Sequence, residues 1–504
     1  MNTSYDITIV GSGIAGLSTL LYLSETNLYR EGKLSICLIC KGSLDETNTN
    51  WAQGGIAAVK ALGDNFEKHI NDTIVAGGFL NNKQIVEKVI NTAPCLLDDL
   101  INWGTKFDKN FEGEYDLAKE GGHSEARIWH KQDQTGKAIQ VALINRLRLL
   151  NNVTIFDHTC VTNAINLSAK SFGLQLFDKN TNKFSTLHCN KLVLATGGLG
   201  MLYDKSTNQR ISTGDGICIA SQLGAIIENL SFIQFHPTGL FDNGQTSFLI
   251  SEALRGTGAI LRNQDGQSFM FKYDERLDLA PRDIVSRAIV SEIASQSNPY
   301  VYLDATQINP KILNSHFPTI KQECMNRLGI NIEKEFIPIL PVQHYSCGGV
   351  KVNEFGETSI SGLFAIGEIS STGLHGSNRL ASNSLLEAIA FAKFAIPKLL
   401  EAKKEPSNNS YNREMADELP ILKKIDKKVV QQIMSKYAGI VKSNQGLKEA
   451  LEQLSKTKEK AVFIPNFNLE YYEANCLLEV AIMVVKDAQN QSSNKGVFYN
   501  IDLE

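Results

Sequence analysis

The sequence lacks three kinds of feature, and each absence removes a class of protein. No uninterrupted apolar run reaches the roughly 18–20 residues of a membrane span, and no basic region precedes the first apolar run, so we expect neither a membrane anchor nor a signal peptide. The formal net charge of -4 does not favour binding to nucleic acid. The nine cysteines are scattered, and the one CxxC spacing, Cys37 and Cys40, sits in an apparent strand where both look like core thiols. We therefore expect no zinc or other metal site, no disulfide framework and a reducing cytoplasm.

What is present describes a large soluble globular protein. The chain has 504 residues, of which 43% are hydrophobic and 21% are charged. This length suffices for roughly two to four domains with a sizeable core. No internal repeat divides the chain, so its function is inferred from local motifs.

A β-prone run, residues 6–10, leads directly into a glycine-rich turn near the start of the chain. The turn is followed by a helix-like segment with an apolar stripe and by a second strand, residues 34–40. In this order the first glycine of GxGxxG makes the turn, the second lets the backbone approach a pyrophosphate, and the third lets the helix pack on the strand. The motif predicts nucleotide binding by Gly11, Ser12, Gly13, Ile14, Ala15 and Gly16.

The end of the second strand departs from the usual dinucleotide-binding pattern. An acid for the ribose hydroxyls is expected there, but the chain has Lys41, whose side chain cannot accept hydrogen bonds. This argues against a standard NAD dehydrogenase. A later apolar strand, residues 362–366, ends at Gly367-Glu368, which makes Glu368 the candidate for the ribose or ribityl hydroxyls. An acid that returns from the far end of the chain predicts a doubly wound FAD domain split by an insertion.

Two further segments predict contacts to the same nucleotide. Residues 47–58 contain a glycine pair, which lets backbone lie against a flat ring, and polar side chains that suit a pyrimidine edge. The alternative is a loop that turns into the next element. Residues 213–216 form a glycine turn that carries an acid. The predicted cofactor-binding residues in these parts of the chain are Lys41, Asn48, Thr49, Asn50, Trp51, Ala52, Gln53, Gly54, Gly55 and Asp215.

The run from Gly373 to Glu387 is dense in polar side chains and opens directly into an apolar helix, Leu385 to Ile396. A helix N-terminus presents free N–H groups and a partial positive charge, so its natural guest is a phosphate, a carboxylate or an electron-rich flavin edge. The alternative is a polar turn with a good cap. Arg379 is a planar fork that suits a carboxylate. Asn383, Ser384 and Leu385 stand where the helix starts.

Taken together, the motifs resemble one group of flavoproteins. They are GSGIAGL, AQGGIAA, EGGHSEARI, ATGG, TGDG, QFHPT, SEALRG, APRDIVSRAI, HYSCGGV, AIGE and GLHGSNRLASNSLLE, in this order along the chain. As a set they resemble the succinate dehydrogenase and fumarate reductase superfamily, and within it the L-aspartate oxidase family, from about residue 5 to the C-terminus.

The resemblance implies an α/β fold in three parts. These are a split Rossmann-like FAD-binding domain, residues 1–244 and 340–403; an inserted α+β capping domain, residues 245–339; and a C-terminal helical bundle, residues 413–504. The sequence favours each part: residues 282–295 suit a helix, and residues 404–412 suit a linker. Helical spacing follows over residues 421–454 and 472–489.

The resemblance also implies the substrate site, because this superfamily acts on C4 dicarboxylates. The implied substrate-binding residues are Gln234, His236, Ser251, His344 and Arg379, and the residues implied to meet the flavin at the later helix start are Asn383, Ser384 and Leu385. The implied acid/base is Arg282, although a free arginine is a poor base, with Glu252 and Arg255 as its proton relay. A surface ion pair is the alternative reading of Glu252 and Arg255, which are three residues apart. The other histidines, His69, His130, His158 and His188, are expected to be ordinary packed or surface residues, and His375 to brace its loop.

Glu120, in the EGGHS motif, separates the possible substrates. A carboxylate beside a dicarboxylate site repels succinate or fumarate and attracts an ammonium group. In aspartate oxidases a glutamate of this motif faces the substrate amino group, and the succinate enzymes lack it. The alternative is a solvated loop acid with Arg127 as its local counter-ion.

The implied reaction is the FAD-dependent oxidation of L-aspartate to iminoaspartate by hydride transfer to flavin N5, with reoxidation by O2 or fumarate. It is the first step of NAD biosynthesis from aspartate, and the imine is expected to pass to quinolinate synthase. Asn48 stands where respiratory relatives carry the histidine that is linked to FAD, so non-covalent FAD is expected. Ser251 and Ser346 replace the family's usual threonines, and residues 493–498 depart from its Glu-Ser-Arg-Gly-x-His, which puts C-terminal packing in doubt.

Two other functions compete with this interpretation. A soluble fumarate reductase shares nearly every residue named above except Glu120. A non-catalytic FAD-binding protein of the glucose-inhibited division type would act through partners or RNA, but it needs no dicarboxylate clamp. Arg282, His344 and Arg379 together argue against it.

Overall fold

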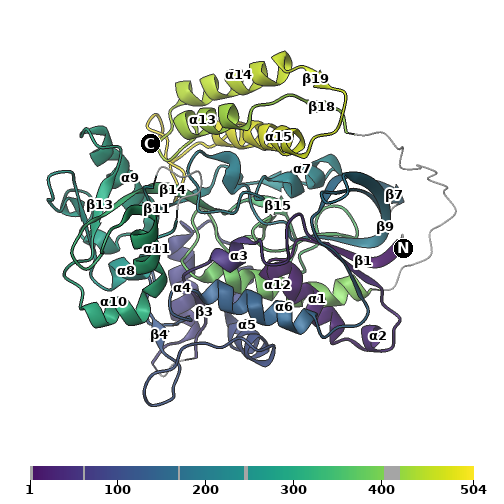
Figure 1. The fold of residues 1–504 in the computed structure, drawn as a ribbon, viewed down its shortest axis with the longest axis horizontal. Helices are drawn as coiled ribbons and strands as arrows, with labels where there is room; N and C mark the ends of the chain where they lie inside the picture. The colour runs from purple at the N-terminus through teal and green to yellow at the C-terminus, as the bar shows by residue number, and fades with distance from the viewer. Residues whose placement is uncertain (1–3, 61–62, 169–170, 243–247, 402–419) are drawn as a thin grey trace.

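The computed structural model describes residues 4–60, 63–168, 171–242, 248–401 and 420–504 (Figure 1). Its largest sheet has the strand order β6-β2-β1-β9-β8-β7, with β16 also paired to β9. Strands β6, β2, β1, β9 and β16 are parallel, and β7 and β8 are antiparallel additions. The strands are β1 (Ser4–Val10), β2 (Ile36–Ile39), β6 (Val153–Phe156), β7 (Thr159–Ser168), β8 (Ser171–Asp178), β9 (Lys183–Leu194) and β16 (Leu363–Ala365).

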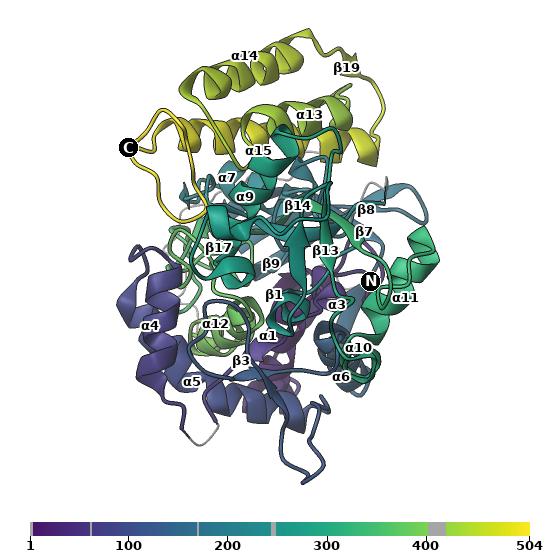
Figure 2. The same ribbon diagram turned by 90° about the vertical axis from the view of Figure 1, so that its left-hand side faces the viewer.

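Apolar sequence explains why the parallel strands lie in the interior. Strand β2 is buried at every residue, as are the last four residues of β1, because helices cover a parallel sheet on its faces. Helices α1 and α12 pack against each other, and α6 packs on α1. Figure 2 shows α4 and α5 beside α12, away from the bundle. These helices are α1 (Ile14–Ser24), α2 (Asn27–Arg30), α3 (Asn48–Trp51), α4 (Phe66–Ala76), α5 (Lys83–Asn102), α6 (Thr135–Leu147) and α12 (Asn383–Leu400).

Strand β16 brings the late part of the chain back into the first sheet. Leu363 pairs with Leu192 and Ala365 with Leu194, so the two strands end side by side. The sequence between them builds other layers before the chain returns. The predicted split Rossmann-like fold is therefore confirmed.

The inserted region shares a sheet with the strands that flank it and has its own apolar core. The sheet order is β11-β14-β13-β12, and the region lies on the left of Figure 1. The helix expected at residues 282–295 is α9. The elements are β11 (Ile233–Leu240), α8 (Glu252–Gly256), β12 (Ile260–Arg262), η2 (Met270–Lys272), η3 (Leu277–Leu279), α9 (Arg282–Ala294), β13 (Val301–Asp304), α10 (Pro310–His316), α11 (Pro318–Leu328) and β14 (Ile337–Ser346).

The C-terminal helices form a bundle over α7 (Asp215–Gln222), at the top of Figure 1. The expectation of continuous helical spacing over residues 421–454 is wrong in detail, since the segment opens with a short strand and then breaks between two helices. Asp426 and Ser443 cap those helices separately. The predicted linker at 404–412 lies outside the described residues. The elements are β18 (Leu422–Lys423), α13 (Lys427–Tyr437), α14 (Asn444–Lys460), β19 (Phe463–Ile464) and α15 (Leu469–Gln489).

The C-terminal stretch is packed in spite of its unusual sequence. Phe498 is buried, and the Val497 amide donates to the Ser377 carbonyl at 3.1 Å, in the loop that carries Arg379. Short elements complete the fold: β3 (Ile56–Ala57), β4 (Leu117–Ala118), β5 (Ile128–Trp129), η1 (Gly200–Leu202), β10 (Ile227–Glu228), β15 (Gly349–Lys351) and β17 (Ser370–Ser371). Within the described ranges, no helix is both long enough and apolar enough to cross a membrane.

Candidate active site

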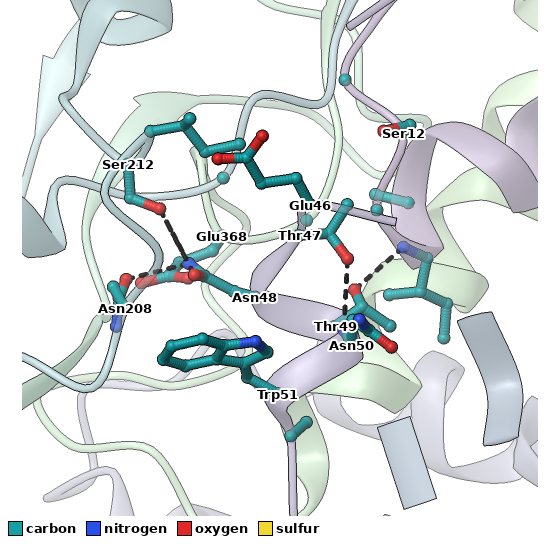
Figure 3. Close-up of a pocket in the computed structure, with 18 of the residues that line it drawn as sticks. Ser12, Glu46, Thr47, Asn48, Thr49, Asn50, Trp51, Asn208, Ser212 and Glu368 are labelled. Atoms are coloured by element: carbon teal, nitrogen blue, oxygen red, sulfur yellow. Dashed lines mark hydrogen bonds between the residues drawn. The ribbon is translucent and has the colours of Figure 1, made fainter. Parts of the chain in front are cut away.

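A cavity of about 520 Å³ opens where the carboxyl ends of β1, β9 and β16 meet (Figure 3). Its lining gathers motifs that are far apart in the sequence. Of the predicted cofactor-binding residues, the structure brings these to its wall: Gly11, Ser12, Gly13, Ile14, Ala15, Lys41, Asn48, Thr49, Asn50, Trp51, Ala52, Gln53, Asp215, Glu368, Ser384 and Leu385. Of the predicted substrate residues, His344 and Arg379 line it.

The glycine-rich turn is shaped by close backbone approach. Gly11 has φ +114°, and a Cβ there would overlap the Ala195 carbonyl at the end of β9. A Cβ on Gly16 would overlap the Gly11 backbone, so Gly16 serves helix packing and does not line the cavity. The Ile14 amide donates to Thr49 Oγ1 at 3.0 Å. The turn thus presents the N-terminus of α1 to the cavity, which suits a pyrophosphate.

Asn48 is held in place by three neighbours, two of which, Asn208 and Ser212, are labelled in Figure 3. Its amide nitrogen donates to Asn208 Oδ1 at 2.9 Å and Ser212 Oγ at 3.1 Å, and its oxygen accepts from the Gln209 amide at 2.8 Å. An asparagine amide has no nucleophilic ring nitrogen. The residue at this position can therefore bind a flavin by contact but offers no atom for a covalent link.

The lining fits FAD by two observations on its polar groups. Gln53 Oε1 is buried without a hydrogen-bond partner in the described structure, so a donor on a bound ring would satisfy it. Glu368 follows β16, where its carboxylate accepts from the Ser346 amide at 3.1 Å, and burial raises its pKa to about 7. A carboxyl at the end of a parallel strand is suited to sugar hydroxyls. In contrast, Gly54 and Gly55 do not line the cavity.

Lys41 acts as a hydrogen-bond donor and a cation, and not as a hydrogen-bond acceptor. Its Nζ donates to Thr213 Oγ1 at 2.7 Å and forms ion pairs with Asp215 at 3.2 Å and with Glu473 of α15 at 3.0 Å. Burial alone lowers the pKa of Lys41, but the two carboxylates outweigh it and the pKa is raised. The ammonium group therefore joins the bundle to the cavity wall.

Two arginines converge on one amide oxygen beside the cavity. Gln234 Oε1 accepts from Arg282 Nη1 at 3.1 Å and from Arg379 Nε and Nη2 at 3.2 and 3.1 Å. Arg379 also stacks over the Tyr345 ring, 4.6 Å from its centroid. Burial and the charge of Arg282 lower the pKa of Arg379 to about 10, so it remains charged near neutral pH.

His236 and His344 face each other next to these arginines, with ring centroids 5.3 Å apart. His236 is buried and His344 is half-buried on the cavity wall, and desolvation together with the neighbouring arginine charges lowers their pKa values well below the usual range. The rings are therefore neutral at physiological pH. A neutral imidazole donates one hydrogen bond without adding charge.

Glu252 lies between two arginines. Arg282 Nε donates to Glu252 Oε2 at 2.6 Å, and Arg255 Nη2 lies 3.8 Å from Glu252 Oε1 on the same helix, α8. Burial raises the pKa of Glu252, but Arg282 and Arg255 outweigh it and the pKa is lowered. The reading of Glu252 and Arg255 as a surface ion pair is wrong, because both side chains are buried. Arg255 Nε has no acceptor in the described residues.

Glu120 is buried and bonded to the loop that carries Arg379. Its Oε2 accepts from Ser382 Oγ at 2.5 Å. Burial raises the pKa of Glu120, and Glu252 adds to this effect. The reading as a solvated acid with Arg127 as counter-ion is wrong, because Arg127 is paired with Asp64 at 2.8 Å and with Asp72 at 2.5 Å.

Several predicted residues are brought near the cavity but not to its wall: Gly16, Gly54, Gly55, Glu120, Gln234, His236, Ser251, Glu252, Arg255, Arg282 and Asn383. Ser251 caps α8, accepting from the Ala253 amide at 3.3 Å. Gln234 connects Arg282 to Arg379 on the wall. The cavity therefore has an inner polar layer behind the residues that line it.

Sequence reasoning missed a support for the flavin-side helix. The oxygen of Asn383 lies 2.9 Å from His69 Nε2, and its amide donates to Thr73 Oγ1 at 3.0 Å. His69 is thus more than an ordinary packed histidine. His123 likewise lies 3.0 Å from the Ala381 carbonyl. His375 braces its loop as expected, within 3.1 Å of Glu387 Oε2.

Comparison with known proteins decides the family. A family profile described as FAD binding domain matches residues 6–385. The chain is 38% identical to an L-aspartate oxidase of Neisseria meningitidis serogroup B over 100% of both chains. It is 37% identical to one from Acinetobacter baylyi over 99% of this chain and 93% of that protein.

The chain belongs to the L-aspartate oxidase family.

Solved structures agree with this family membership. A structure of E. coli quinol fumarate reductase superposes with a TM-score of 0.91 at 28% identity, covering 100% of this chain and 92% of that one. As a member of this flavoprotein family, the chain uses FAD as its cofactor. Among the described residues, no cluster of histidine, cysteine and acidic side chains could hold a metal ion.

Proposed function

We propose that this protein is an L-aspartate oxidase that converts L-aspartate to iminoaspartate with FAD as hydride acceptor. The observation that carries the proposal is a buried carboxyl, Glu120, next to a cationic dicarboxylate pocket. A pocket for succinate alone gains nothing from a buried carboxylate, whereas an amino acid with two carboxylates needs one anionic contact among the cationic ones.

The protein side of the mechanism follows from the charges. Arg379 binds one substrate carboxylate, and His236 and His344 donate neutral hydrogen bonds to the substrate. Glu120 binds the ammonium group and so fixes the direction in which the substrate Cα–H bond points. Bound FAD supplies a hydride acceptor at flavin N5.

Arg282 is the proposed acid/base. Its Nε donates to Glu252 at 2.6 Å, and the lowered pKa of Glu252 keeps that carboxylate ionised. A proton that Arg282 exchanges with the substrate is thereby returned through Glu252 and Arg255. Burial of all three groups keeps bulk water from competing for the proton.

The cap is proposed to span residues 245–339, between FAD-binding residues 1–244 and 340–403, with the bundle at 413–504. Separate apolar cores in the cap and in the sheet domain support this division. Among the contacts between cap and sheet domain, Asp133 accepts from the Thr319 and Ile320 amides at 2.9 and 3.0 Å, at the start of α11. Closure of the cap over substrate would protect the imine from hydrolysis.

Electrons leave by reoxidation with O2 or fumarate, and the product would enter NAD biosynthesis through quinolinate synthase. A soluble fumarate reductase is the second candidate, supported by the likeness to quinol fumarate reductase at a TM-score of 0.91. Both activities use the same dicarboxylate clamp. They differ in whether the amino group is recognised.

Anaerobic flavin bleaching tests the proposal. L-aspartate should bleach the bound FAD, while succinate and buffer should not. Bleaching by succinate alone would support the fumarate reductase and overturn the proposal.

A substitution tests whether Glu120 contacts the amino group of the substrate. Glu120→Gln should raise KM for aspartate roughly 10- to 100-fold, because it removes one charge-assisted bond, and should change KM for fumarate far less. The matched control is Glu125→Gln, in the same loop, where Glu125 pairs with exposed Lys68. Equal effects on both substrates would remove Glu120 from its proposed role.

The mode of FAD attachment is tested separately. Acid precipitation of the holoenzyme should release the yellow colour into the supernatant, since Asn48 offers no linking atom. Colour that stays with the pellet would contradict non-covalent binding.

A further inference from the structure

Ser382 connects the three parts of the site that are most distant in sequence. Its hydroxyl accepts from the Gly55 amide at 3.1 Å and donates to Glu120 Oε2 at 2.5 Å. Its carbonyl accepts from the Ala57 amide at 3.0 Å. The side chain is buried. Ser382 therefore touches both the AQGG segment and the acid of the EGGHS motif.

The backbone at Ser382 is in an unusual conformation. Its φ is +60°, in the left-handed region that a non-glycine residue adopts at a cost. The residue stands at the start of α12, where a serine ordinarily caps the helix, but its side chain makes no capping hydrogen bond. The conformation directs the hydroxyl toward Glu120 and away from the helix.

The direction of the hydrogen bonds favours the ionised form of Glu120. A hydroxyl has a single proton, and the Gly55 amide already occupies one of its lone pairs. The Ser382 proton therefore goes to Glu120, which accepts it best as a carboxylate. A proton on Glu120 Oε2 would leave the Ser382 proton without an acceptor in a buried place.

The second oxygen of Glu120 lies next to Gly54. A Cβ on Gly54 would lie 2.9 Å from Glu120 Oε1, so the absence of a side chain at Gly54 makes room for that oxygen. The Ser382 hydroxyl thus holds one oxygen of the carboxyl, and Gly54 leaves room for the other. The orientation of the carboxyl is set before any substrate arrives.

We propose that Ser382 is a positioning residue for substrate selection, which orients the Glu120 carboxylate and keeps it ionised to receive an ammonium group. The inference rests on the proposed function and adds to it a residue that does not touch substrate. Burial and Glu252 raise the pKa of Glu120, and the Ser382 hydroxyl opposes both. Without the hydroxyl, Glu120 takes up a proton at higher pH and loses its hold on the amino group.

The test uses Ser382→Gly in the holoenzyme. Glycine adopts positive φ without strain, so this variant removes the hydroxyl and keeps the backbone. KM for aspartate should rise roughly tenfold or more, and the acid limb of the kcat/KM profile should move to higher pH. KM for fumarate should stay unchanged or fall, because a protonated Glu120 no longer repels a dianion.

Three further variants make the result specific. In a Glu120→Gln background, Ser382→Gly should add little, because the group it acts through is gone. Ser382→Thr keeps the hydroxyl and should restore the wild-type position of the acid limb, even where its branched Cβ lowers stability at positive φ. Ser443→Gly removes the serine that accepts from the Gly446 amide at the start of α14 and should leave both KM values unchanged.

Two outcomes overturn the inference. One is an unchanged acid limb in Ser382→Gly, and the other is an equal rise of KM for aspartate and fumarate. A wild-type enzyme that does not oxidise aspartate would overturn the proposed function instead, so the two failures are distinguishable.

Discussion

Two clusters of buried charge border the same cavity and are neutralised in opposite ways. At Lys41, one cation is paired with two carboxylates, Asp215 and Glu473. In the dicarboxylate pocket, Arg255 and Arg282 pair with one carboxylate, Glu252, while Arg379 forms no ion pair among the described residues. In the first cluster the carboxylates outnumber the cation, whereas in the second the cations outnumber the ion-paired carboxylate. A buried ion pair that is complete in the folded chain holds structure, and one that is incomplete awaits a ligand.

The largest effect is expected from a substitution in the incomplete cluster of the dicarboxylate pocket. Arg379→Lys keeps the charge but loses the planar fork that donates to Gln234 from two nitrogens. We expect kcat/KM for aspartate to fall by roughly 10²- to 10³-fold, about 3–4 kcal/mol of transition-state binding. Steady-state kinetics measure it, with the flavin spectrum as the control for a folded holoenzyme. A fall of less than about threefold would remove Arg379 from the clamp.

Glu368 provides a third case for the comparison of buried charges. In the described structure its carboxyl is bonded to Ser346 and pairs with no cation. Glu368 has a pKa raised by burial from 4.5 to about 7 in the folded protein. Since the folded state holds this proton more tightly, its stabilising contribution is present below pH 4.5 and is lost as pH rises through about 7. In FAD-free protein, Glu368→Gln should abolish a stability difference of up to about 3 kcal/mol between about pH 5 and about pH 8. Denaturant titrations at both pH values measure the free energy of unfolding of wild type and variant. If this attribution is wrong, the two free energies will change with pH by the same amount.

The complete cluster should respond in stability and not in substrate binding. Glu473→Gln leaves Lys41 with Asp215 alone and should lower the free energy of unfolding by about 1–3 kcal/mol, with KM for aspartate unchanged. Thermal unfolding and kinetics on the same preparation measure both. A raised KM with unchanged stability would reverse the assigned roles of the two clusters.

The smallest effect is the matched control on the same helix. Glu479 of α15 pairs with Lys458 at 2.6 Å, but both side chains are more than 40% exposed. Solvent screens such a pair, so Glu479→Gln should change the free energy of unfolding by about 1 kcal/mol or less. A loss equal to that of Glu473→Gln would mean that the bundle responds to any lost charge on α15.

Local patterns predicted the parts of the site that depend on neighbours in sequence. The glycine turn at Gly11 and the acid that ends β16, Glu368, both line the cavity, because a strand end determines where the next residues point. The contacts missed from the sequence are long-range. The hydrogen bond between Ser382 and Glu120 and the ion pair between Glu473 and Lys41 both follow from tertiary packing. No rule of sequence spacing connects the elements involved.

The bundle shows the same limit in secondary structure. Residues 421–454 have helical spacing, yet Leu422 lies in a strand, because it pairs with Ile464 from the far side of α14. A pairing partner outside the local window outweighed the local propensity. The caps at Asp426 and Ser443, in contrast, are side chains that a sequence pattern can recognise.

The return of β16 to β9 also has a consequence for synthesis on the ribosome. Leu194 ends β9, and β16, which pairs with β9 at Leu192–Leu194, begins only at Leu363. At about 5–20 residues per second, the nascent chain waits roughly 10–30 seconds with one side of β9 lacking β16. During that interval a row of backbone donors and acceptors is open to wrong pairing. A cell that elongates this chain slowly would therefore gain most from a chaperone that engages the nascent chain before residue 363 emerges.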